Sequence, residues 1–212
     1  MTKITVVLIF LLALILPFIT WYQTNGQIIF QSNTSTEASL KLIFPLFGLL
    51  GFSLIWLQIM LGAFMRPLYA LFAPFDLVRF HIWEGVVAII IVLLHPTILG
   101  IAQVLRKGVG WNLLSIDFVE PRYTIYIILG EIALILFLTA AAAAILRNHT
   151  LLVKNWRKIH VLQYAVFILI TLHSLSVGSH TQTGTLRLLW YFYAITFLAA
   201  LVYKKVLHKK IT

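Results

Sequence analysis

The 212-residue sequence contains no cysteine, which excludes disulfides, thiolate chemistry and Cys-ligated metal sites. Charged residues are also scarce: they make up 10% of the chain, whereas soluble domains carry about 25%. Apolar residues make up 61%, and the mean hydropathy is +1.00. These proportions exclude a soluble domain and indicate an integral membrane protein that lies mostly within the bilayer.

Acidic residues number 6 against 16 lysines and arginines, which gives a formal net charge of +10. A strongly basic chain can bind nucleic acid, but here the basic residues lie in short clusters between apolar stretches. That distribution is typical of the signals that set the orientation of a membrane protein. We therefore expect contact with membrane lipid and no nucleic-acid partner.

Six apolar stretches are long enough to cross the bilayer, which needs about 20 residues of helix. The first stretch continues into "PFITWYQTNG" without a small-residue cleavage site, so we expect a retained helix and not a cleaved signal peptide. The loops and tails are too short for a second domain. The sequence therefore predicts one all-α transmembrane domain over residues 1–212, a six-helix bundle with helices at about 4–22, 41–64, 80–104, 123–147, 158–178 and 185–204.

Lysine and arginine placement predicts the orientation of these helices. If the helices alternate, one side carries the N-terminus, the loops after helices two and four, and the basic tail. Positively charged segments remain in the cytoplasm, so we predict a multi-pass protein of the cell (inner) membrane with both termini cytoplasmic. The basic residues of that side are Lys3, Arg66, Arg79, Arg147, Lys154, Arg157, Lys158, Lys204, Lys205, Lys209 and Lys210.

Two of the predicted helices carry two histidines each. The third contains "FHIWEGVVAIIIVLLHP", with His81 and His95, and the fifth contains "WRKIHVLQYAVFILITLH", with His160 and His173. The spacings of 14 and 13 residues correspond to about 21 and 19.5 Å along a helix. Because both helices run in the same direction, His81 matches the depth of His160 near the cytoplasmic side, and His95 matches that of His173 further out.

These pairs of imidazoles fit the axial ligands of haem. A neutral imidazole nitrogen is a good ligand for iron, and a polar side chain inside a membrane is costly unless it has a partner. Two axial histidines leave no open iron position, which favours electron transfer over oxygen chemistry. The sequence thus predicts two b-type haems between helices three and five, an inner haem on His81 and His160 and an outer haem on His95 and His173.

Ideal helical geometry places the two histidines on the same face in one of the two histidine helices. Fourteen residues at 100° each fall about 40° short of four turns, so His81 and His95 share a face, whereas thirteen residues fall about 140° short. We therefore expect that the fifth helix bends or twists between His160 and His173, or that the haems approach it from different sides. Pro96 removes a backbone donor, which predicts a kink in the third helix.

Basic residues near the ends of the histidine helices have two interpretations. They can pair with haem propionates, or they can serve only as orientation signals. The inner candidates are Arg79, Arg157 and Lys158, and the outer candidates are Arg106, Lys107, Arg122 and Arg187.

Other polar residues extend the candidate site. Glu84 and Glu131 lie within predicted helices and can relay protons, hydrogen-bond a ligand imidazole or act as structural acids. We expect interhelical hydrogen bonds from Gln58 and Gln163. His180 lies in an outer loop, as a plain loop residue or in contact with an electron acceptor. Solvated side chains are expected for His149 and His208.

The two histidine segments resemble those of the ferric reductase-like transmembrane family, which includes the membrane domains of ferric reductases and NADPH oxidases. Members place histidine pairs on the third and fifth of six helices at these same offsets, the thirteen-residue step included. The resemblance covers nearly the whole chain and implies His81 with His160 on one haem and His95 with His173 on the other. It also implies electron transfer to an outer-side acceptor, such as ferric chelates, oxygen or a partner enzyme.

We expect the electron donor to be a separate molecule, a cytoplasmic flavoprotein or a membrane quinol. Ferric reductases and NADPH oxidases continue into a flavin and nicotinamide domain, whereas this sequence ends at "YKKVLHKKIT" and contains no Gly-rich nucleotide loop. The layout is similar to the haem subunit of the periplasmic methionine sulfoxide reductase system. Members of that group can lack one of the four ligands, and this chain has all four.

Two other functions are open on the sequence. The chain can be the membrane anchor subunit of a larger oxidoreductase, with quinone as a further cofactor. It can also be a transporter or proton channel in which the histidines and Glu84 or Glu131 form a relay, although no paired half-structures favour that interpretation.

Overall fold

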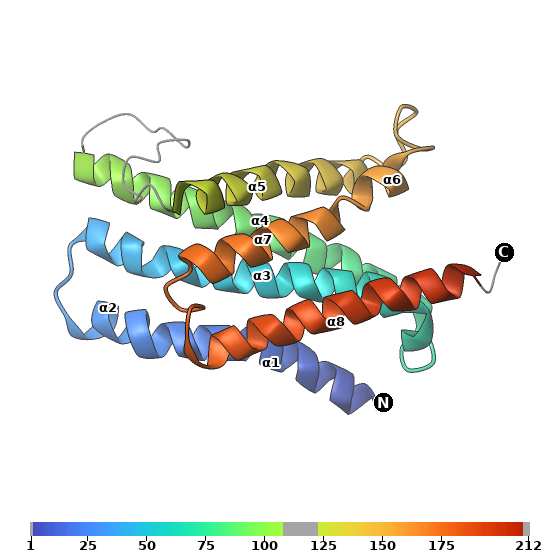
Figure 1. The fold of residues 1–212 in the computed structure, drawn as a ribbon, viewed down its shortest axis with the longest axis horizontal. Coiled ribbons are helices and arrows are strands. Elements are labelled where there is room, and N and C mark those ends of the chain that lie inside the picture. Colours follow the sequence, from blue (N-terminus) through green and yellow to red (C-terminus); the bar gives the residue numbers. More distant parts are fainter. Residues whose placement is uncertain (1, 108–122, 210–212) are drawn as a thin grey trace.

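A computed structural model describes residues 2–107 and 123–209 of the chain, and Figure 1 shows its fold. Every regular element in these ranges is helical, and six helical segments are long and apolar enough to cross a membrane. The prediction of six membrane-capable helices is confirmed. The elements are α1 Lys3–Trp21, a π-helix Tyr22–Gly26, α2 Gln27–Gln31, α3 Thr36–Leu68, α4 Pro74–Lys107, α5 Thr124–Ile145, α6 Trp156–His160, α7 Gln163–Val177 and α8 Gly184–Lys209.

The first helical segment is longer than the sequence predicts. α1 continues through the π-helix into α2, so the segment reaches Gln31 and does not end near residue 22. Trp21 Nε1 and Asn25 Nδ2 both donate to the carbonyl oxygen of Leu42 on α3, at 2.7 and 3.0 Å. These two bonds fasten the polar segment to α3, which explains why it continues as helix where a loop was expected.

α3 also begins before the predicted range of 41–64 and ends after it. Ser35 caps its N-terminus, because Ser35 Oγ accepts a hydrogen bond from the backbone N–H of Ala38 at 3.3 Å. Glu37 lies in the first turn, where the helix dipole favours an acid, and it pairs with Lys41 one turn later. Polar residues thus form the first turns of this helix.

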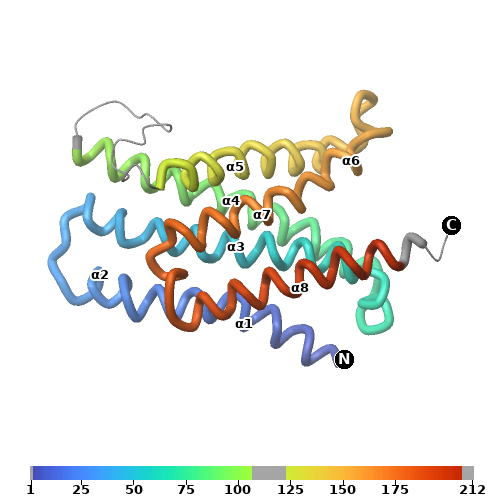
Figure 2. The backbone as a smooth tube through the Cα atoms, in the orientation of Figure 1, coloured from blue at the N-terminus to red at the C-terminus, as the bar shows by residue number. Residues whose placement is uncertain are grey.

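α3 is the central helix of the bundle. It packs along α4 and also contacts α1 and α8, whereas α5 packs mainly along α7, as Figures 1 and 2 show. Tyr193 of α8 joins three helices: its hydroxyl donates to the Ala13 carbonyl at 3.1 Å and lies 3.2 Å from Ser53 Oγ. Trp56 stacks on the Tyr193 ring with 4.3 Å between centroids. α7 joins the same core, because the Phe167 ring lies 5.2 Å from that of Phe52 on α3 and 4.4 Å from that of Phe197 on α8.

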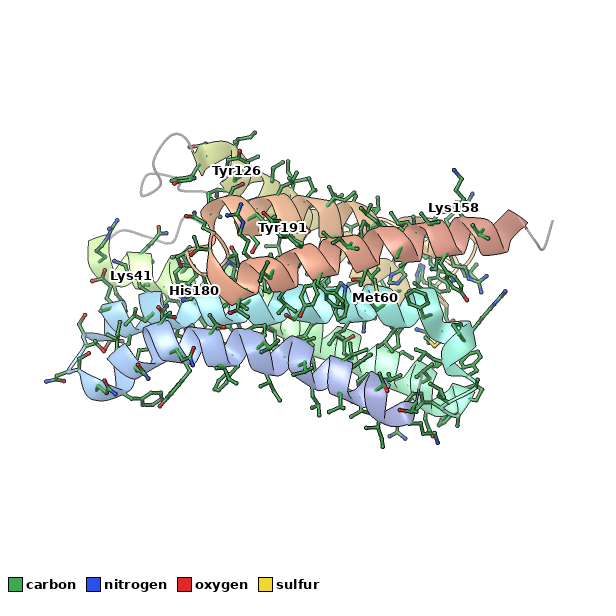
Figure 3. The ribbon with its side chains drawn as sticks, turned by 60° about the horizontal axis from the view of Figure 1, so that its bottom comes forward. Lys41, Met60, Tyr126, Lys158, His180 and Tyr191 are labelled. Carbon is green, nitrogen blue, oxygen red and sulfur yellow. The ribbon has the colours of Figure 1, made fainter. Side chains whose placement is uncertain are left out.

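Both termini lie at the same end of the bundle, together with the loops that join α3 to α4 and α5 to α6 (Figure 2). We call it the inner end and the opposite end the outer end, after the predicted orientation. Figure 3 shows Lys158 toward the inner end and Lys41, Tyr126 and His180 toward the outer end. This arrangement agrees with alternating helices.

The fifth membrane segment is interrupted directly after His160. Val161 and Leu162 link α6 to α7, with ψ angles of −19° and −20° that are typical of a 3₁₀ turn. Leu162 N–H donates to the Ile159 carbonyl, and Tyr164 N–H donates to the Val161 carbonyl, both at 3.0 Å and three residues back. A 3₁₀ turn is wound more tightly than an α-helix, so the link overwinds the segment between the two histidines.

This break affects the thirteen-residue step between His160 and His173. Each 3₁₀ residue advances about 120° instead of 100°, which is the direction needed to bring His160 toward the face of His173. The predicted span of 158–178 corresponds to Trp156–Val177, which is overwound after His160. Two residues at about 120° recover about 40° of the 140° shortfall, so the approach of the haems from different sides stays a prediction beside the twist. α4, in contrast, continues as α-helix through Pro96 to Lys107.

Candidate functional site

The four histidines lie on the two segments predicted to carry them. His81 and His95 belong to α4, His160 is the last residue of α6, and His173 lies in α7, and all four side chains are partly buried. The side chains of His81 and His160 are close enough to interact electrostatically, and so are those of His95 and His173. The interactions follow the two depth levels expected from the sequence.

The two histidine helices do not pack on each other. α4 packs mainly on α3, and α7 mainly on α5, and within the described residues α4 and α7 make no extended backbone contact. A planar cofactor held from both sides requires such a separation. The backbone arrangement is therefore compatible with a macrocycle between α4 and α7.

The outer pair, His95 and His173, is held by main-chain carbonyls of neighbouring helices. His95 Nδ1 lies 2.9 Å from the Phe44 carbonyl oxygen on α3, and His173 Nδ1 lies 2.8 Å from the Tyr126 carbonyl oxygen on α5. A carbonyl can only accept, so each Nδ1 carries the proton and donates it. In a neutral imidazole this leaves the Nε2 lone pair free to bind a metal.

The inner pair, His81 and His160, is held more loosely. His160 Nδ1 lies 3.4 Å from the Ala140 carbonyl oxygen, and among the described residues His81 Nδ1 is buried without a hydrogen-bond partner. Gln58 Nε2 donates to the His81 carbonyl at 2.6 Å and also to Glu84 Oε2. The expected interhelical role of Gln58 is confirmed, and Glu84 is a structurally paired acid one turn after His81.

Glycines next to the histidines are a feature that the sequence reasoning missed. Gly48 and Gly62 of α3 face His95 and His81, and Gly130 of α5 faces His173. A signal for them exists in the sequence, because Gly48 and Gly62 are 14 residues apart, the same spacing as His81 and His95 on the antiparallel neighbour. Glycine is frequent in transmembrane helices, so this match has meaning only once α3 and α4 are known to be neighbours.

These observations together fit haem. Proton-bearing Nδ1 atoms with free Nε2 atoms are what axial ligation requires, and the oriented ring hydrogen bond is the usual support of a metal-bound histidine. Within residues 2–107 and 123–209, no three His, Asp or Glu side chains gather as a group that could hold a metal ion. Axial ligation needs only two side chains per iron, so it does not depend on such a group.

Comparison with known proteins identifies the family. The family model described as "Ferric reductase like transmembrane component" matches residues 47–171, more than half of the chain. The chain belongs to the ferric reductase-like transmembrane family. No curated protein and no solved structure matches it. Membership of this family indicates a membrane electron-transfer function.

The matched segment covers the part of this ferric reductase-like chain that carries the candidate site. It begins in α3, contains α4, α5 and α6, and ends in α7 at residue 171. His81, His95 and His160 lie inside it, and His173 lies two residues beyond its end. α1 and α8 lie outside the match, although both pack on α3.

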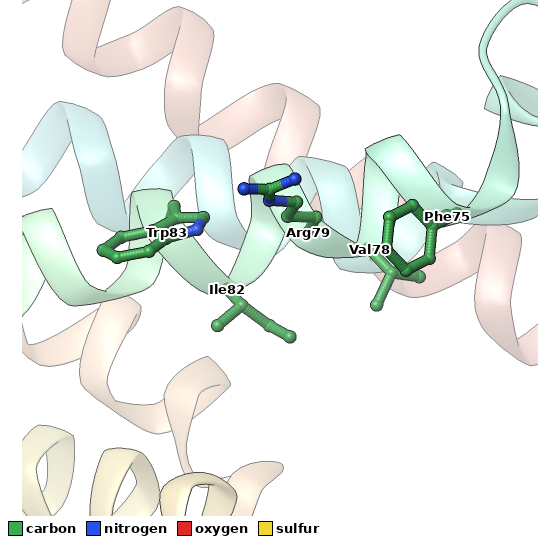
Figure 4. A pocket seen from close by; sticks show the side chains of 5 residues that line it. All are labelled: Phe75, Val78, Arg79, Ile82 and Trp83. Atoms are coloured by element: carbon green, nitrogen blue, oxygen red, sulfur yellow. The ribbon is translucent and has the colours of Figure 1, made fainter.

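The two inner arginines, Arg79 and Arg157, are exposed. The Arg157 guanidinium lies over the Trp156 ring, 5.4 Å from its centroid. Arg79 lines a groove of about 320 Å³ on α4 with Phe75, Val78, Ile82 and Trp83, shown in Figure 4. Arg79 is two residues before His81, which places it about 160° around the helix, a position that favours the orientation-signal interpretation.

The structure describes the side chains of two of the four candidates for the outer propionates, Arg187 and Arg106. Arg187 Nε donates to the Tyr191 hydroxyl at 2.8 Å, and its Nη1 donates to the Gln182 carbonyl at 2.8 Å. Arg106 lies in the last turn of α4 and is exposed. Arg122 and the side chain of Lys107 lie outside the described residues.

His180 links the loop between α7 and α8 to the first helical segment. Its Nε2 lies 2.8 Å from Thr24 Oγ1, and its Nδ1 lies 3.0 Å from Ser179 Oγ. Burial lowers the pKa of His180 below its usual value, which favours the neutral ring. His149 is exposed in the loop after α5, as expected, and the side chain of His208 lies outside the described residues.

Proposed function

We propose that this ferric reductase-like protein is a di-haem b-type electron carrier of the cell membrane. It moves electrons from a cytoplasmic flavoprotein or a quinol to an acceptor on the outer side. The main support is the hydrogen bond from Nδ1 to a backbone carbonyl oxygen, which His95 and His173 make and which His160 makes at longer distance. A side chain whose Nδ1 is fixed in this way presents Nε2 for ligation.

In this proposal His81 and His160 hold the inner haem, and His95 and His173 hold the outer haem. Haem iron with two imidazole ligands supplies reversible one-electron chemistry without an open coordination position. The two levels are separated by 14 residues of α4, or about 21 Å along the helix axis, which covers most of the apolar core of a bilayer about 30 Å thick. Arg157 is the better candidate for the inner propionates, because Arg79 lies about 160° around α4 from His81.

Optical spectroscopy with haem quantification tests the proposal. The purified full-length protein, expressed with haem supplied, should give a reducible low-spin b-type spectrum and about two haems per chain, because axial histidine pairs give that spin state. His95→Ala or His173→Ala should each remove the outer haem and leave the inner one.

His149→Ala is the matched control, since His149 is an exposed loop histidine, and it should leave the haem content unchanged. A colourless unmutated protein contradicts the proposal. Loss of both haems from a folded His95→Ala protein contradicts the assignment of pairs.

The groove of Figure 4 favours a second candidate, a quinone-binding anchor subunit. Its lining is apolar apart from the Arg79 guanidinium, and it lies toward the inner end of α4. All five lining residues lie on α4 and are exposed, so a quinone that diffuses in the lipid can contact this apolar surface and the Arg79 guanidinium. Quinol should then reduce the purified protein directly, and Arg79→Ala should slow that reduction, whereas dithionite should reduce both proteins equally. Equal quinol rates in the two proteins would exclude this groove as the quinone site.

A further inference from the structure

The two outer histidines use the same local device on two different helices. His95 donates to the carbonyl of Phe44 in α3, and His173 donates to the carbonyl of Tyr126 in α5. In each case the residue four positions after that carbonyl is glycine, Gly48 and Gly130. A helical carbonyl already bonds the N–H of the residue four positions on, so a ring that approaches its second lone pair must pass beside that residue.

The space beside each glycine is too small for a side chain. A Cβ on Gly48 would lie 2.8 Å from His95 Cε1 and 2.9 Å from Nδ1. A Cβ on Gly130 would lie 2.6 Å from His173 Nδ1 and 2.9 Å from Cε1. Carbon atoms in favourable contact are about 3.5–4.0 Å apart, so a methyl group at either position must displace the imidazole.

The inner histidines provide an internal comparison. A Cβ on Gly62 would lie 3.8 Å from His81 Cε1, which is an ordinary contact, and His81 Nδ1 makes no carbonyl bond in the part of α3 and α4 that the structure describes. His160 Nδ1 lies at the longer distance of 3.4 Å from the Ala140 carbonyl, and the residue four positions on is alanine, Ala144. The short ring-to-carbonyl bond occurs only where that position is glycine.

We propose that Gly48 and Gly130 are positioning residues for the outer haem, because their missing side chains let His95 and His173 reach the carbonyls of Phe44 and Tyr126. This inference rests on the proposed function. A donated Nδ1–H fixes the tautomer, orients the ring and makes Nε2 a stronger donor to iron. At the inner level His160 has only the longer 3.4 Å contact, and His81 Nδ1 has no partner among the described residues, so the two haems differ in how firmly their ligands are oriented.

Alanine substitutions in the full chain test the inference. Gly48→Ala and Gly130→Ala should each weaken binding of the outer haem, by about 10–100-fold, as expected for loss of a supporting hydrogen bond at a metal ligand. Any outer haem retained should have a more positive midpoint potential, because a weaker imidazole donor stabilises ferric iron less. The inner haem should keep its potential and its electron paramagnetic resonance g values.

Gly62→Ala is the matched control, because it adds the same methyl group to the same helix with room for it. It should leave both haems unchanged. Alanine is also a better helix former than glycine, so loss of helix stability does not explain a deficit in Gly48→Ala or Gly130→Ala. Two haems with unchanged potentials in Gly48→Ala and Gly130→Ala overturn the inference while the proposed function stands. An unmutated protein without haem overturns the proposed function itself.

A measurement on the unmutated protein covers the case in which the variants do not accumulate. Pulsed electron paramagnetic resonance of protein labelled with ¹⁵N-histidine reports the remote ring nitrogen of each low-spin haem. The outer haem should show the signature of a hydrogen-bonded Nδ1–H on both ligands, and the inner haem should differ from it. Identical signatures at the two haems contradict the inference.

Discussion

Glu84 is the one acid with a buried side chain among the described residues, at 7% exposure. Its Oε2 accepts a hydrogen bond from Gln58, and its Oε1 has no partner in the described part of the chain. Gln58 also donates to the backbone carbonyl of His81. One amide group on α3 thus satisfies two acceptors on α4, on the turn that begins at the inner histidine.

Gln58→Leu should therefore destabilise the protein by about 1–3 kcal/mol, the usual cost of leaving a buried polar group without its partner. Glu84→Gln keeps a side chain that can bond Gln58 and should cost less. Reversible unfolding in mixed micelles measures both. The double variant Gln58→Leu/Glu84→Leu should lose less than the sum of the two Leu variants, and strictly additive losses would argue against a coupled pair.

At the scale of residues, the sequence predicts the histidines but not their supports. An imidazole in an apolar helix is conspicuous because its burial is costly, so His81, His95, His160 and His173 could be singled out. Backbone carbonyls have no sequence signature. Gly130 becomes informative only when its distance to the His173 ring is known.

At the scale of elements, the α6–α7 link is the feature most sensitive to chain length. Its two residues, Val161 and Leu162, set the rotation of His160 relative to His173. An alanine inserted between Val161 and Leu162 turns His160 by about 100° and should remove the inner haem. The outer haem should stay, since the insertion precedes Gln163 and leaves α7, with His173 and its contacts with α5, unchanged. Haem quantification and redox titration show which of the two haems is lost.

The control for that insertion is an alanine added after Leu151, which is 80% exposed in the loop between α5 and α6. This loop insertion should leave both haems in place. Retention of the inner haem after insertion in the link would show that the rotation of His160 is not set there.

The element boundaries show where local patterns fail as predictors. Hydropathy alone ends the first span near residue 22 and begins the third near 80, but α2 extends to Gln31 and α4 begins at Pro74. Bonds to a neighbouring helix stabilise the first of these extensions, as Trp21 and Asn25 show with Leu42. The break after His160 contains neither glycine nor proline, so no residue type in the sequence predicts it.

At the scale of the whole molecule, the placement of both termini at one end makes orientation testable. Basic residues concentrate at that end, which the positive-inside rule assigns to the cytoplasm. Green fluorescent protein fused after residue 212 should be fluorescent. Alkaline phosphatase inserted in the loop at 178–183 should be active. The same enzyme inserted in the loop at 146–155 should be inactive. The reverse pattern would place the inner end outside.

The six-helix plan could be predicted because hydrophobic length in a bilayer is a strong constraint on a single chain. Which helices pair could not, since lipid-facing and helix-facing apolar side chains look alike in sequence. Leu57 is 1% exposed on α3, whereas Ile135 on α5 is 64% exposed. Only the packing distinguishes them.

The packing of α7 on the central helices has a consequence for biogenesis. The Phe167 ring of α7 lies 5.2 Å from that of Phe52 on α3 and 4.4 Å from that of Phe197 on α8. Trp190 Nε1 of α8 also donates to Ser174 Oγ of α7 at 2.7 Å. We therefore expect the inserted helices to assemble through protein contacts. Haem, in the proposed function, would then enter a bundle that is already packed, and its supply would limit the activity of the protein and not its accumulation.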